Sequence, residues 1–187
     1  MVRILALSGS LRAASLNSML LRAMAQLASN RVEVALFGAL GALPLFNPDL
    51  EAAPPASVVS FQRAVAEADA LLIASPEYAH GVSGTIKNAL DWLVGFAPFV
   101  AKRVAVLNAS PRAHHADDAL RETLRTMAAQ IIEPASIDVP LLGARLDEAA
   151  ILATPALATT LRGCLQAIEA EVLAQRGASS APLGRTR

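Results

Sequence analysis

Near its N-terminus the chain reads Val2-Arg3-Ile4-Leu5-Ala6-Leu7-Ser8-Gly9-Ser10-Leu11-Arg12. The aliphatic run at residues 2–7 has the length and composition of a buried β-strand, and it ends in a polar turn that contains glycine. After this turn, apolar residues recur at helical spacing over residues 16–28, at Leu16, Leu20, Ala23 and Leu27. The stretch therefore predicts a strand, a polar loop and a helix, which is the first part of a parallel β-α-β unit.

The same alternation of aliphatic runs and helical patterns continues along the chain. Further strands are predicted at residues 31–37, 70–74, 103–109 and 136–139. Further helices are predicted at residues 57–68, 84–93, 117–131 and 154–177. Ser57 is predicted to cap the first of these helices, Thr154 and Pro155 to begin the last one, and Gly177 to end it.

Five strands alternating with five helices predict an α/β protein with a doubly wound, five-stranded parallel sheet. Helices are expected on both faces, because parallel strands are joined by right-handed helical crossovers. Five strands favour the order 2-1-3-4-5, in which ligands bind beyond the carboxyl ends of strands 1 and 3. One domain is predicted over residues 1–176, followed by a small, polar, disordered tail over residues 177–187.

The loop after the first strand groups donors that suit a phosphate. Ser10, Ser15 and Asn17 supply hydroxyl and amide groups, and Arg12 supplies a guanidinium beside a predicted helix N-terminus. Free N–H groups and the helix dipole favour an anion there, and a guanidinium can bind two of its oxygens. Simple helix capping is the alternative, but it explains one of these side chains and not the group. The motifs G-x-G-x-x-G and G-x-x-x-x-G-K-[ST] are absent from this loop.

The loop after the third strand is also chemically distinctive, and it reads Ser75-Pro76-Glu77-Tyr78-Ala79-His80-Gly81-Val82-Ser83-Gly84. Pro76 stiffens the exit from the strand, and the two glycines allow backbone conformations that are closed to other residues. The backbone N–H groups of residues 78 and 79 are predicted to bind the edge of a planar heterocycle, with Tyr78 covering part of the ring. An ordinary loop with a surface aromatic is the alternative, which the loop alone leaves open.

Composition and charge limit the possible classes of protein. The 187 residues are 54% hydrophobic and 17% charged, which excludes an extended disordered chain. Lys and Arg number 16 against 16 Asp and Glu, so no basic field favours nucleic acid. No apolar run reaches the roughly 20 residues that cross a bilayer, and no signal peptide pattern is present, so a cytoplasmic protein without membrane partners is expected.

The single cysteine and the three histidines are expected to be structural or solvated rather than metal ligands. Cys164 alone cannot form an internal disulfide or a zinc cluster, and it is predicted to be a small core residue. His80, His114 and His115 have no cysteine or acidic partner at ligand spacing, so we expect surface-loop histidines and no metal.

Taken together, the two loops resemble those of the NADPH-dependent FMN reductase family of flavodoxin-like proteins. The resemblance covers residues 2 to about 176 and rests on Gly9-Ser10-Leu11-Arg12 with Ser15 and Asn17, Pro76-Glu77-Tyr78, and Lys87-Asn88-Ala89-Leu90-Asp91-Trp92. It implies a flavodoxin-like fold, non-covalently bound FMN, and hydride transfer from NADPH or NADH through FMN to a small acceptor. The acceptors implied are a quinone, a free flavin, an azo compound or a metal oxyanion. Because the cofactor carries the chemistry, no catalytic side chain is expected.

The resemblance also implies roles for individual residues. Loop residues that hold the FMN phosphate map onto Ser10, Leu11, Arg12, Ser15 and Asn17. Residues that border the isoalloxazine, mainly through backbone atoms, map onto Pro76, Glu77, Tyr78 and Ala79, and Ser110 matches a serine in the loop after the fourth strand. The helix that contains Lys87 to Trp92 implies a homodimer or, by further pairing, a homotetramer.

The loop after the fourth strand departs from the family pattern, and it leaves two other functions open. Bulkier residues at 111–115, including Arg112, replace the glycines of the family, which implies a narrower pocket, weaker FMN binding or altered access for the second substrate. Arg112 either faces the flavin or a coenzyme phosphate, or is a solvated charge. The alternatives are a flavodoxin-type electron carrier and a flavin-free scaffold. Such carriers are typically strongly acidic, which the neutral chain is not.

Overall fold

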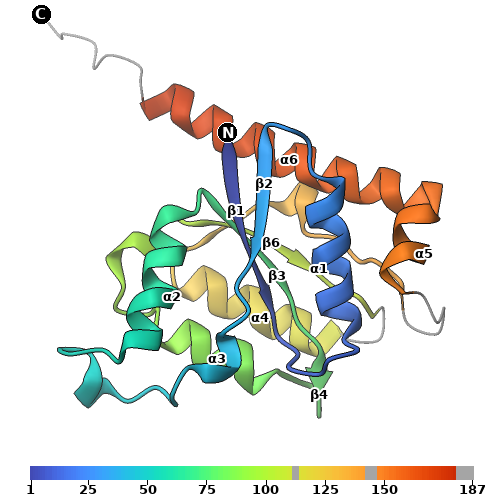
Figure 1. Ribbon diagram of the computed structural model, residues 1–187. Helices are drawn as coiled ribbons and strands as arrows, with labels where there is room; N and C mark the ends of the chain where they lie inside the picture. The colour runs from blue at the N-terminus through green and yellow to red at the C-terminus, as the bar shows by residue number, and fades with distance from the viewer. Residues whose placement is uncertain (111–113, 142–146, 180–187) are drawn as a thin grey trace, which may run out of the picture.

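A five-stranded parallel sheet forms the centre of the protein, as the computed structural model in Figure 1 shows. The structure describes residues 1–110, 114–141 and 147–179. The strand order is β2-β1-β3-β6-β7, which is the predicted order 2-1-3-4-5 when the sheet strands are counted along the chain. These strands are β1 (Val2–Ser8), β2 (Val32–Leu36), β3 (Ala70–Ala74), β6 (Arg103–Leu107) and β7 (Gln130–Ile131).

Helices cover both faces of the sheet, because successive side chains of a strand point to opposite faces and both sets are apolar. In β1, Ile4 and Ala6 pack with one group of helices, whereas Leu5 and Leu7 pack with the other. The first group is α1 (Leu16–Leu27), α5 (Glu148–Ala153) and α6 (Pro155–Ser179). The second group is α2 (Ala56–Glu67), α3 (Gly84–Asp91) and α4 (His114–Thr126).

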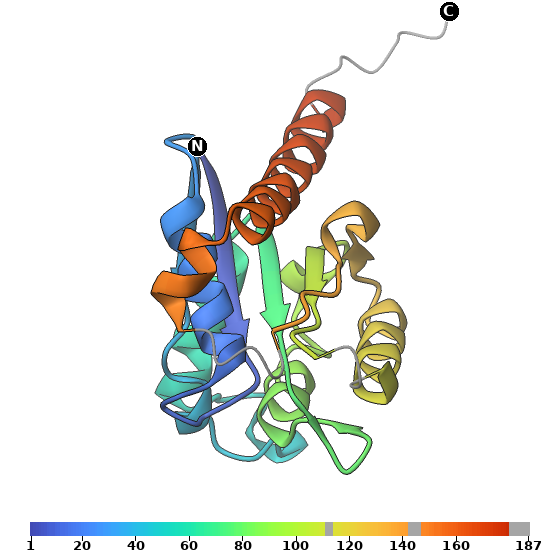
Figure 2. The same cartoon turned by 90° about the vertical axis from the view of Figure 1, so that its right-hand side faces the viewer.

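Short elements lie between these helices and strands. Single turns of 3-10 helix occur at η1 (Leu40–Ala42), η2 (Pro48–Leu50), η3 (Ala97–Phe99) and η4 (Glu133–Ala135). Two-residue strands β4 (Glu77–Tyr78) and β5 (Gly81–Val82) pair as an antiparallel hairpin where the sequence predicts a plain loop. Figures 1 and 2 both show this hairpin projecting beyond the carboxyl end of β3.

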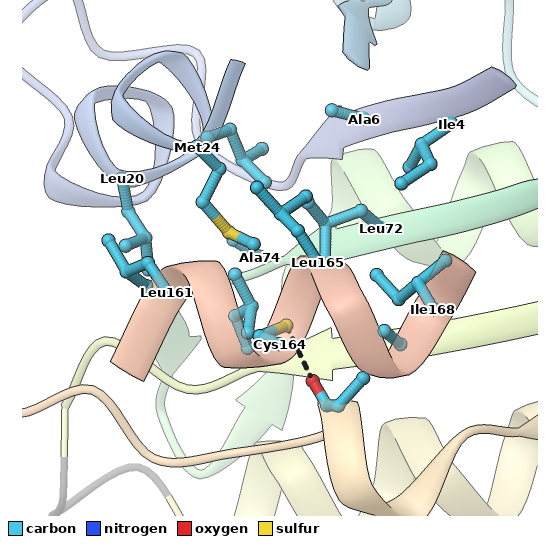
Figure 3. Packing of buried hydrophobic residues seen from close by; sticks show 14 of the residues in the cluster. Ile4, Ala6, Leu20, Met24, Leu72, Ala74, Leu161, Cys164, Leu165 and Ile168 are labelled. Atoms are coloured by element: carbon cyan, nitrogen blue, oxygen red, sulfur yellow. Dashed lines mark hydrogen bonds between the residues drawn. The ribbon is translucent and has the colours of Figure 1, made fainter. Parts of the chain in front are cut away.

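Cys164 belongs to the hydrophobic core under α6, as predicted. Figure 3 shows it on the face of α6 that carries Leu161, Leu165 and Ile168 toward side chains of β1 and β3. Its thiol donates a hydrogen bond to the carbonyl oxygen of Ala135 at 3.2 Å. Burial raises the pKa of this thiol to about 12, so the group is neutral and unreactive in the folded chain.

The fifth sheet strand lies earlier in the sequence than predicted. Helix α4 ends at Thr126 rather than near residue 131, because Ala128 adopts a left-handed conformation with φ of 59° and the chain then enters β7. Glycine usually provides this kind of helix end, so an alanine there gives no stop signal. The strand predicted at residues 136–139 is reduced to an isolated parallel bridge between Asp138 and Asn108.

Three predicted helix ends are also corrected. Helix α2 begins at Ala56 directly after Pro55, whose ring fixes φ at −55°, and no side chain caps it, so Ser57 is not a cap. Pro155 begins α6 as predicted, but the Thr154 hydroxyl donates to Ala150 O in α5 at 2.7 Å. Helix α6 continues through residue 177 to Ser179, and residues 180–187 of the predicted tail lie outside the described residues. No helix within the described ranges is both long and apolar enough to cross a membrane.

Candidate functional site

The carboxyl ends of β1, β3 and β6 meet at a cavity of about 420 Å³. Three loops line it: the first loop (residues 8–17), the second loop (residues 75–83) and the third loop, which follows β6 and is described at residues 108–110. The cavity brings together most of the predicted site residues, namely Ser10, Arg12, Ser15, Asn17, Pro76, Glu77, Tyr78 and Ser110. The other lining residues are Ala14, Leu16, Ser75 and Ala109, which the sequence reasoning did not single out.

Ser15 caps helix α1 and still has a hydroxyl hydrogen to donate. Its Oγ accepts a hydrogen bond from the N–H of Ser18 at 3.3 Å, and its backbone φ of −80° and ψ of 126° are those of an N-cap residue. Within the described part of the chain, the N–H groups of Leu16 and Asn17 have no acceptor. The capping and phosphate-binding interpretations are therefore compatible, since these N–H groups lie at residues that line the cavity.

Asn17 provides a direct test of whether a phosphate fits. The residue is buried, lines the cavity, and its Oδ1 is a buried atom without a hydrogen-bond partner among the described residues. The oxygen and nitrogen of such an amide are distinguished only by their partners. Its Nδ2 is not among the buried atoms that lack a partner, so the NH2 group can donate a hydrogen bond to an oxygen of a phosphate in the cavity.

The remaining polar groups of the first loop leave Arg12 available. Ser10 Oγ accepts from the N–H of Arg12 at 3.4 Å, and Ser8 Oγ lies 2.7 Å from Ser18 Oγ, so hydroxyls connect the loop to α1. The Arg12 side chain is exposed at the cavity and has no ion pair within residues 1–110, 114–141 and 147–179. Its guanidinium can therefore reach an anion in the cavity without breaking an internal contact.

Leu11 does not line the cavity, but it supports the first loop from outside. Its side chain is 66% exposed and lies so close to Gly41 that a Cβ at that glycine would be 2.9 Å from Leu11 Cδ2. Gly9 has a related role between the loops, since a Cβ there would lie 2.4 Å from Ser75 Oγ. The contact between the first and second loops therefore requires a residue without a side chain at position 9.

The second loop is an ordered hairpin with an unusual turn. Ala79 and His80 connect β4 to β5 with φ of 50° and 60°, which is the type I′ pattern that normally carries Asn and Gly. At its base, Ser75 Oγ donates to Ser83 Oγ at 3.2 Å, and Ser83 caps α3 by accepting from Ile86 N–H. Tyr78 lines the cavity and is 58% exposed, whereas Ala79 does not line it.

The Glu77 carboxylate is engaged on both oxygens. Oε2 accepts from the Ala116 N–H at 2.9 Å, in the first turn of α4, and Oε1 lies 3.0 Å from His80 Nδ1. The hydrogen bond from Ala116 is the main reason that the pKa of Glu77 lies below its usual value, with partial opposition from desolvation and further help from His80. Glu77 is therefore ionised at neutral pH, which removes the protonated form that an acid catalyst needs.

The three histidines lie against one another beside the cavity. The ring centroids of His80 and His115 are 4.5 Å apart, and those of His114 and His115 are 4.0 Å apart. Both His114 and His115 belong to the first turn of α4 and not to a loop, which corrects the predicted placement. Among the described residues no cluster of His, Cys, Asp or Glu has the arrangement of a metal site.

The third loop is described only in part. Ser110 lines the cavity, and its N–H donates to Asn108 Oδ1 at 3.0 Å, which fixes the chain as it leaves β6. Asn108 is itself buried and bonds the segment near Asp138 through its backbone. Arg112, for which the sequence leaves several positions open, lies outside the described residues.

Helix α3 combines an exposed ion pair with a buried tryptophan. Lys87 Nζ lies 2.6 Å from Asp91 Oδ1, as the spacing of four residues predicts. Trp92, which follows the helix, is only 3% exposed, and its Nε1–H donates to Pro44 O at 2.8 Å. The ring of Trp92 also contacts that of Phe46 edge-on, so this side chain belongs to the core of the single chain.

The fold and the site together define a flavodoxin-like α/β protein with a loop rich in hydrogen-bond donors at the point where the strand order reverses. Comparison with known families makes this class specific, since residues 2–140 match the family of NADPH-dependent FMN reductases. The chain belongs to this family.

Individual relatives agree with this placement. The chain is 40% identical over 113 residues to an NAD(P)H-dependent FMN reductase of Pseudomonas aeruginosa. This alignment covers 58% of this chain and 60% of that protein. The chain is 44% identical over 97 residues to an NADPH:quinone oxidoreductase of Arabidopsis thaliana, which covers 49% of each. These alignments thus span 60% and 49% of the relatives' length, respectively.

A solved structure extends the similarity over nearly the whole chain. The flavoenzyme FerB of Paracoccus denitrificans, an NAD(P)H:(acceptor) oxidoreductase, superposes with a TM-score of 0.75 and 28% sequence identity. The match covers 91% of this chain and 98% of that one. The match therefore extends into the part of the chain beyond residue 140.

Proposed function

We propose that the protein binds FMN non-covalently in the cavity and transfers hydride from NADPH or NADH to a small acceptor, with quinones as the first class to test. The observation that carries this proposal is the donor set of the first loop, which lies at the carboxyl end of β1 beside a cavity long enough to involve three loops. Family membership and the names of the relatives support it. A free flavin, an azo compound or a metal oxyanion are further acceptors of the same proposed activity.

The residues of the first loop would hold the phosphate of FMN. Ser10, Ser15 and Asn17 offer neutral donors, the N-terminus of α1 offers backbone N–H groups, and Arg12 offers two guanidinium donors. The loop is held in this shape by the Ser8–Ser18 contact before any ligand binds. Leu11 lies outside the cavity, and it would stabilise the loop through its contact with Gly41.

The second and third loops would border the flavin ring. Pro76, Glu77 and Tyr78 form one wall of the cavity, and Ser110 lies in the third loop. Ala79 supports this wall from the hairpin turn, because its left-handed backbone sets the direction in which β4 presents its N–H groups. FMN would supply the hydride chemistry, and the protein would orient it, exclude water from one side and surround it with N–H donors that favour negative charge.

The test is direct, since bound FMN is visible by its absorption. Purified protein, supplied with FMN and then desalted, is expected to retain the flavin and to oxidise NADPH or NADH when a quinone is present. A preparation that takes up no FMN would contradict the proposal and favour the flavin-free scaffold. Retained FMN without nicotinamide oxidation would instead favour an electron carrier.

Arg12→Ala provides the residue-level test. Loss of a guanidinium–phosphate hydrogen bond costs about 1.5–3 kcal/mol, so the Kd for FMN should rise about 10- to 100-fold. Arg63→Ala is the matched control, because Arg63 is also an exposed arginine but lies on α2, away from the cavity. Equal FMN affinity in both variants would place the phosphate elsewhere.

We also propose a cytoplasmic homodimer or homotetramer formed through α3 and the residues that follow it. Val94 and Val100, just beyond α3, are 66% and 63% exposed, an apolar exposure that association would cover. The single cysteine is buried and unpaired, which suits a reducing compartment. Sedimentation of the wild type against a Val94→Lys variant tests the assembly, and a monomeric wild type would contradict it.

A further inference from the structure

Both carboxylate oxygens of Glu77 are occupied by contacts within the protein. Glu77 lines the cavity, yet both of its carboxylate oxygens are bonded to groups that do not, namely the His80 ring and the Ala116 N–H. Its side chain is only 12% exposed, compared with 75% for that of His80. The carboxylate therefore joins the tip of the β4–β5 hairpin to the first turn of α4.

Helix α4 is a firm anchor for this contact. Arg121, one turn further along, is largely buried and pairs with Asp117 Oδ2 at 2.6 Å and with Glu133 Oε2 at 3.1 Å. It also donates to the Ser136 carbonyl at 3.3 Å. These contacts fix the first half of α4 to the segment that follows β7, so a group bonded to Ala116 is held to the body of the protein.

The hairpin, in contrast, has no other polar side-chain contact at its tip among the residues that the structure describes: Val82 packs its second strand against the core, and the His80 ring lies against that of His115. Its strands have two residues each, and its turn uses left-handed backbone conformations at Ala79 and His80, which are unfavourable for residues other than glycine. The Ser75–Ser83 hydrogen bond closes its base but does not reach its tip. Such a strained turn persists only where surrounding contacts determine it.

We infer that Glu77 is a positioning residue: its carboxylate holds the β4–β5 hairpin against α4 and thereby fixes the Pro76–Tyr78 wall of the cavity. The inference rests on the proposed function in one respect, since it identifies this wall as the part of the cavity that borders FMN. It assigns the role of Glu77 to its contacts with Ala116 and His80, and not to a contact with the cofactor or to acid catalysis.

Hydrogen exchange of the apo protein tests the positioning role without any cofactor. In Glu77→Ala, the amides of the hairpin and of Ala116 should exchange faster than in the wild type, with those of the five-stranded sheet unchanged. In Glu77→Gln the increase should be smaller, because the amide oxygen can still accept from Ala116 and the amide NH2 can donate to His80 Nδ1. Glu122→Ala is the control, since Glu122 is an exposed glutamate of α4, the helix that contains Ala116.

FMN titration of the same proteins connects the contact to the site. Glu77→Ala should raise the Kd for FMN by about 10-fold, the effect of losing a hydrogen bond to a charged group. Glu77→Gln should raise it less, and Glu122→Ala should leave it unchanged. His80→Ala, which removes one partner of Glu77 together with the ring contact to His115, should loosen the same amides and keeps the inference testable if Glu77→Ala does not fold.

Three outcomes would overturn the inference. In the first, Glu77→Ala changes neither the amide exchange rates nor the Kd for FMN. In the second, Glu77→Gln and Glu77→Ala raise the Kd for FMN equally; in the third, the Kd rises without faster amide exchange. The last two would show that the charge itself acts on the cofactor. Wild-type protein that binds no FMN would refute the proposed function instead, and the exchange experiment would still decide whether Glu77 holds the hairpin.

Discussion

Replacing Gly9 by alanine is expected to destabilise the protein strongly, although the change adds one methyl group. The new Cβ would lie 2.4 Å from Ser75 Oγ, 2.8 Å from Ser83 Oγ and 2.9 Å from Ile86 Cγ1. Relieving these contacts by moving packed groups costs about 1–3 kcal/mol. Displacing Ser83 also weakens the N-cap of α3, which is worth about 1 kcal/mol. The expected loss in the free energy of unfolding is therefore about 2–4 kcal/mol.

Urea denaturation of the apo protein measures this loss. With a slope of about 2 kcal/mol per molar urea, the midpoint of Gly9→Ala should fall by about 1–2 M. Gly38→Ala is the matched control, because a Cβ at Gly38 meets no atom within 4 Å, and its stability should stay within about 0.5 kcal/mol. If Gly9→Ala also stayed within about 0.5 kcal/mol, the close contact between the first and second loops would not exist in solution.

Three further predictions concern groups outside the cavity. The buried Cys164 thiol, with its pKa of about 12, should resist iodoacetamide at pH 8 until urea unfolds the chain, and rapid labelling of the native protein would contradict its burial. Arg103→Met should leave the free energy of unfolding unchanged or raise it by about 1–2 kcal/mol. The reason is that Arg103 Nε and Nη1 are buried without partners among the described residues, while Glu171, which pairs with Nη2, stays in water. A loss above about 2 kcal/mol would refute this. Burial raises the pKa of Asp69, but the hydrogen bond from the Arg3 N–H and the contact with Arg176 outweigh this effect and hold the pKa below 3.8. The contribution of Asp69 to stability is therefore complete above pH 3.8 and is lost as the pH falls through the lowered pKa. Asp69→Asn should therefore flatten the acid side of the stability curve, and an unchanged curve would exclude this carboxylate as a cause.

The features that sequence reasoning predicted well are those that depend on composition over several residues. The aliphatic runs predicted as strands at 2–7, 70–74 and 103–109 need both faces covered, so they indicate central parallel strands, and the structure has β1, β3 and β6 there. A total of five strands favours the order 2-1-3-4-5, and this order places the loops after strands 1 and 3 at the same edge of the sheet. The donor group of the first loop was visible for the same reason, because several polar side chains coincide there.

The features that it missed depend on single backbone conformations and on distant contacts. An alanine at 128 ends α4 and an Ala-His pair forms the hairpin turn, positions where glycine or asparagine would have given a signal. The partners of Glu77 could not be predicted either, since Ala116 lies 39 residues further along the chain and takes part through its backbone.

The position of Trp92 has a spectroscopic consequence. It is the only tryptophan of the chain, it is nearly inaccessible to water, and it follows the helix whose first turn is capped by Ser83 of the second loop. Its fluorescence is therefore a single-site signal, with an emission maximum at short wavelength in the native state and a red shift when α3 separates from the segment around Pro44 and Phe46. Because oxidised flavin absorbs where tryptophan emits, the same side chain would act as an internal energy donor for FMN in the cavity and would report the proposed binding without any added label.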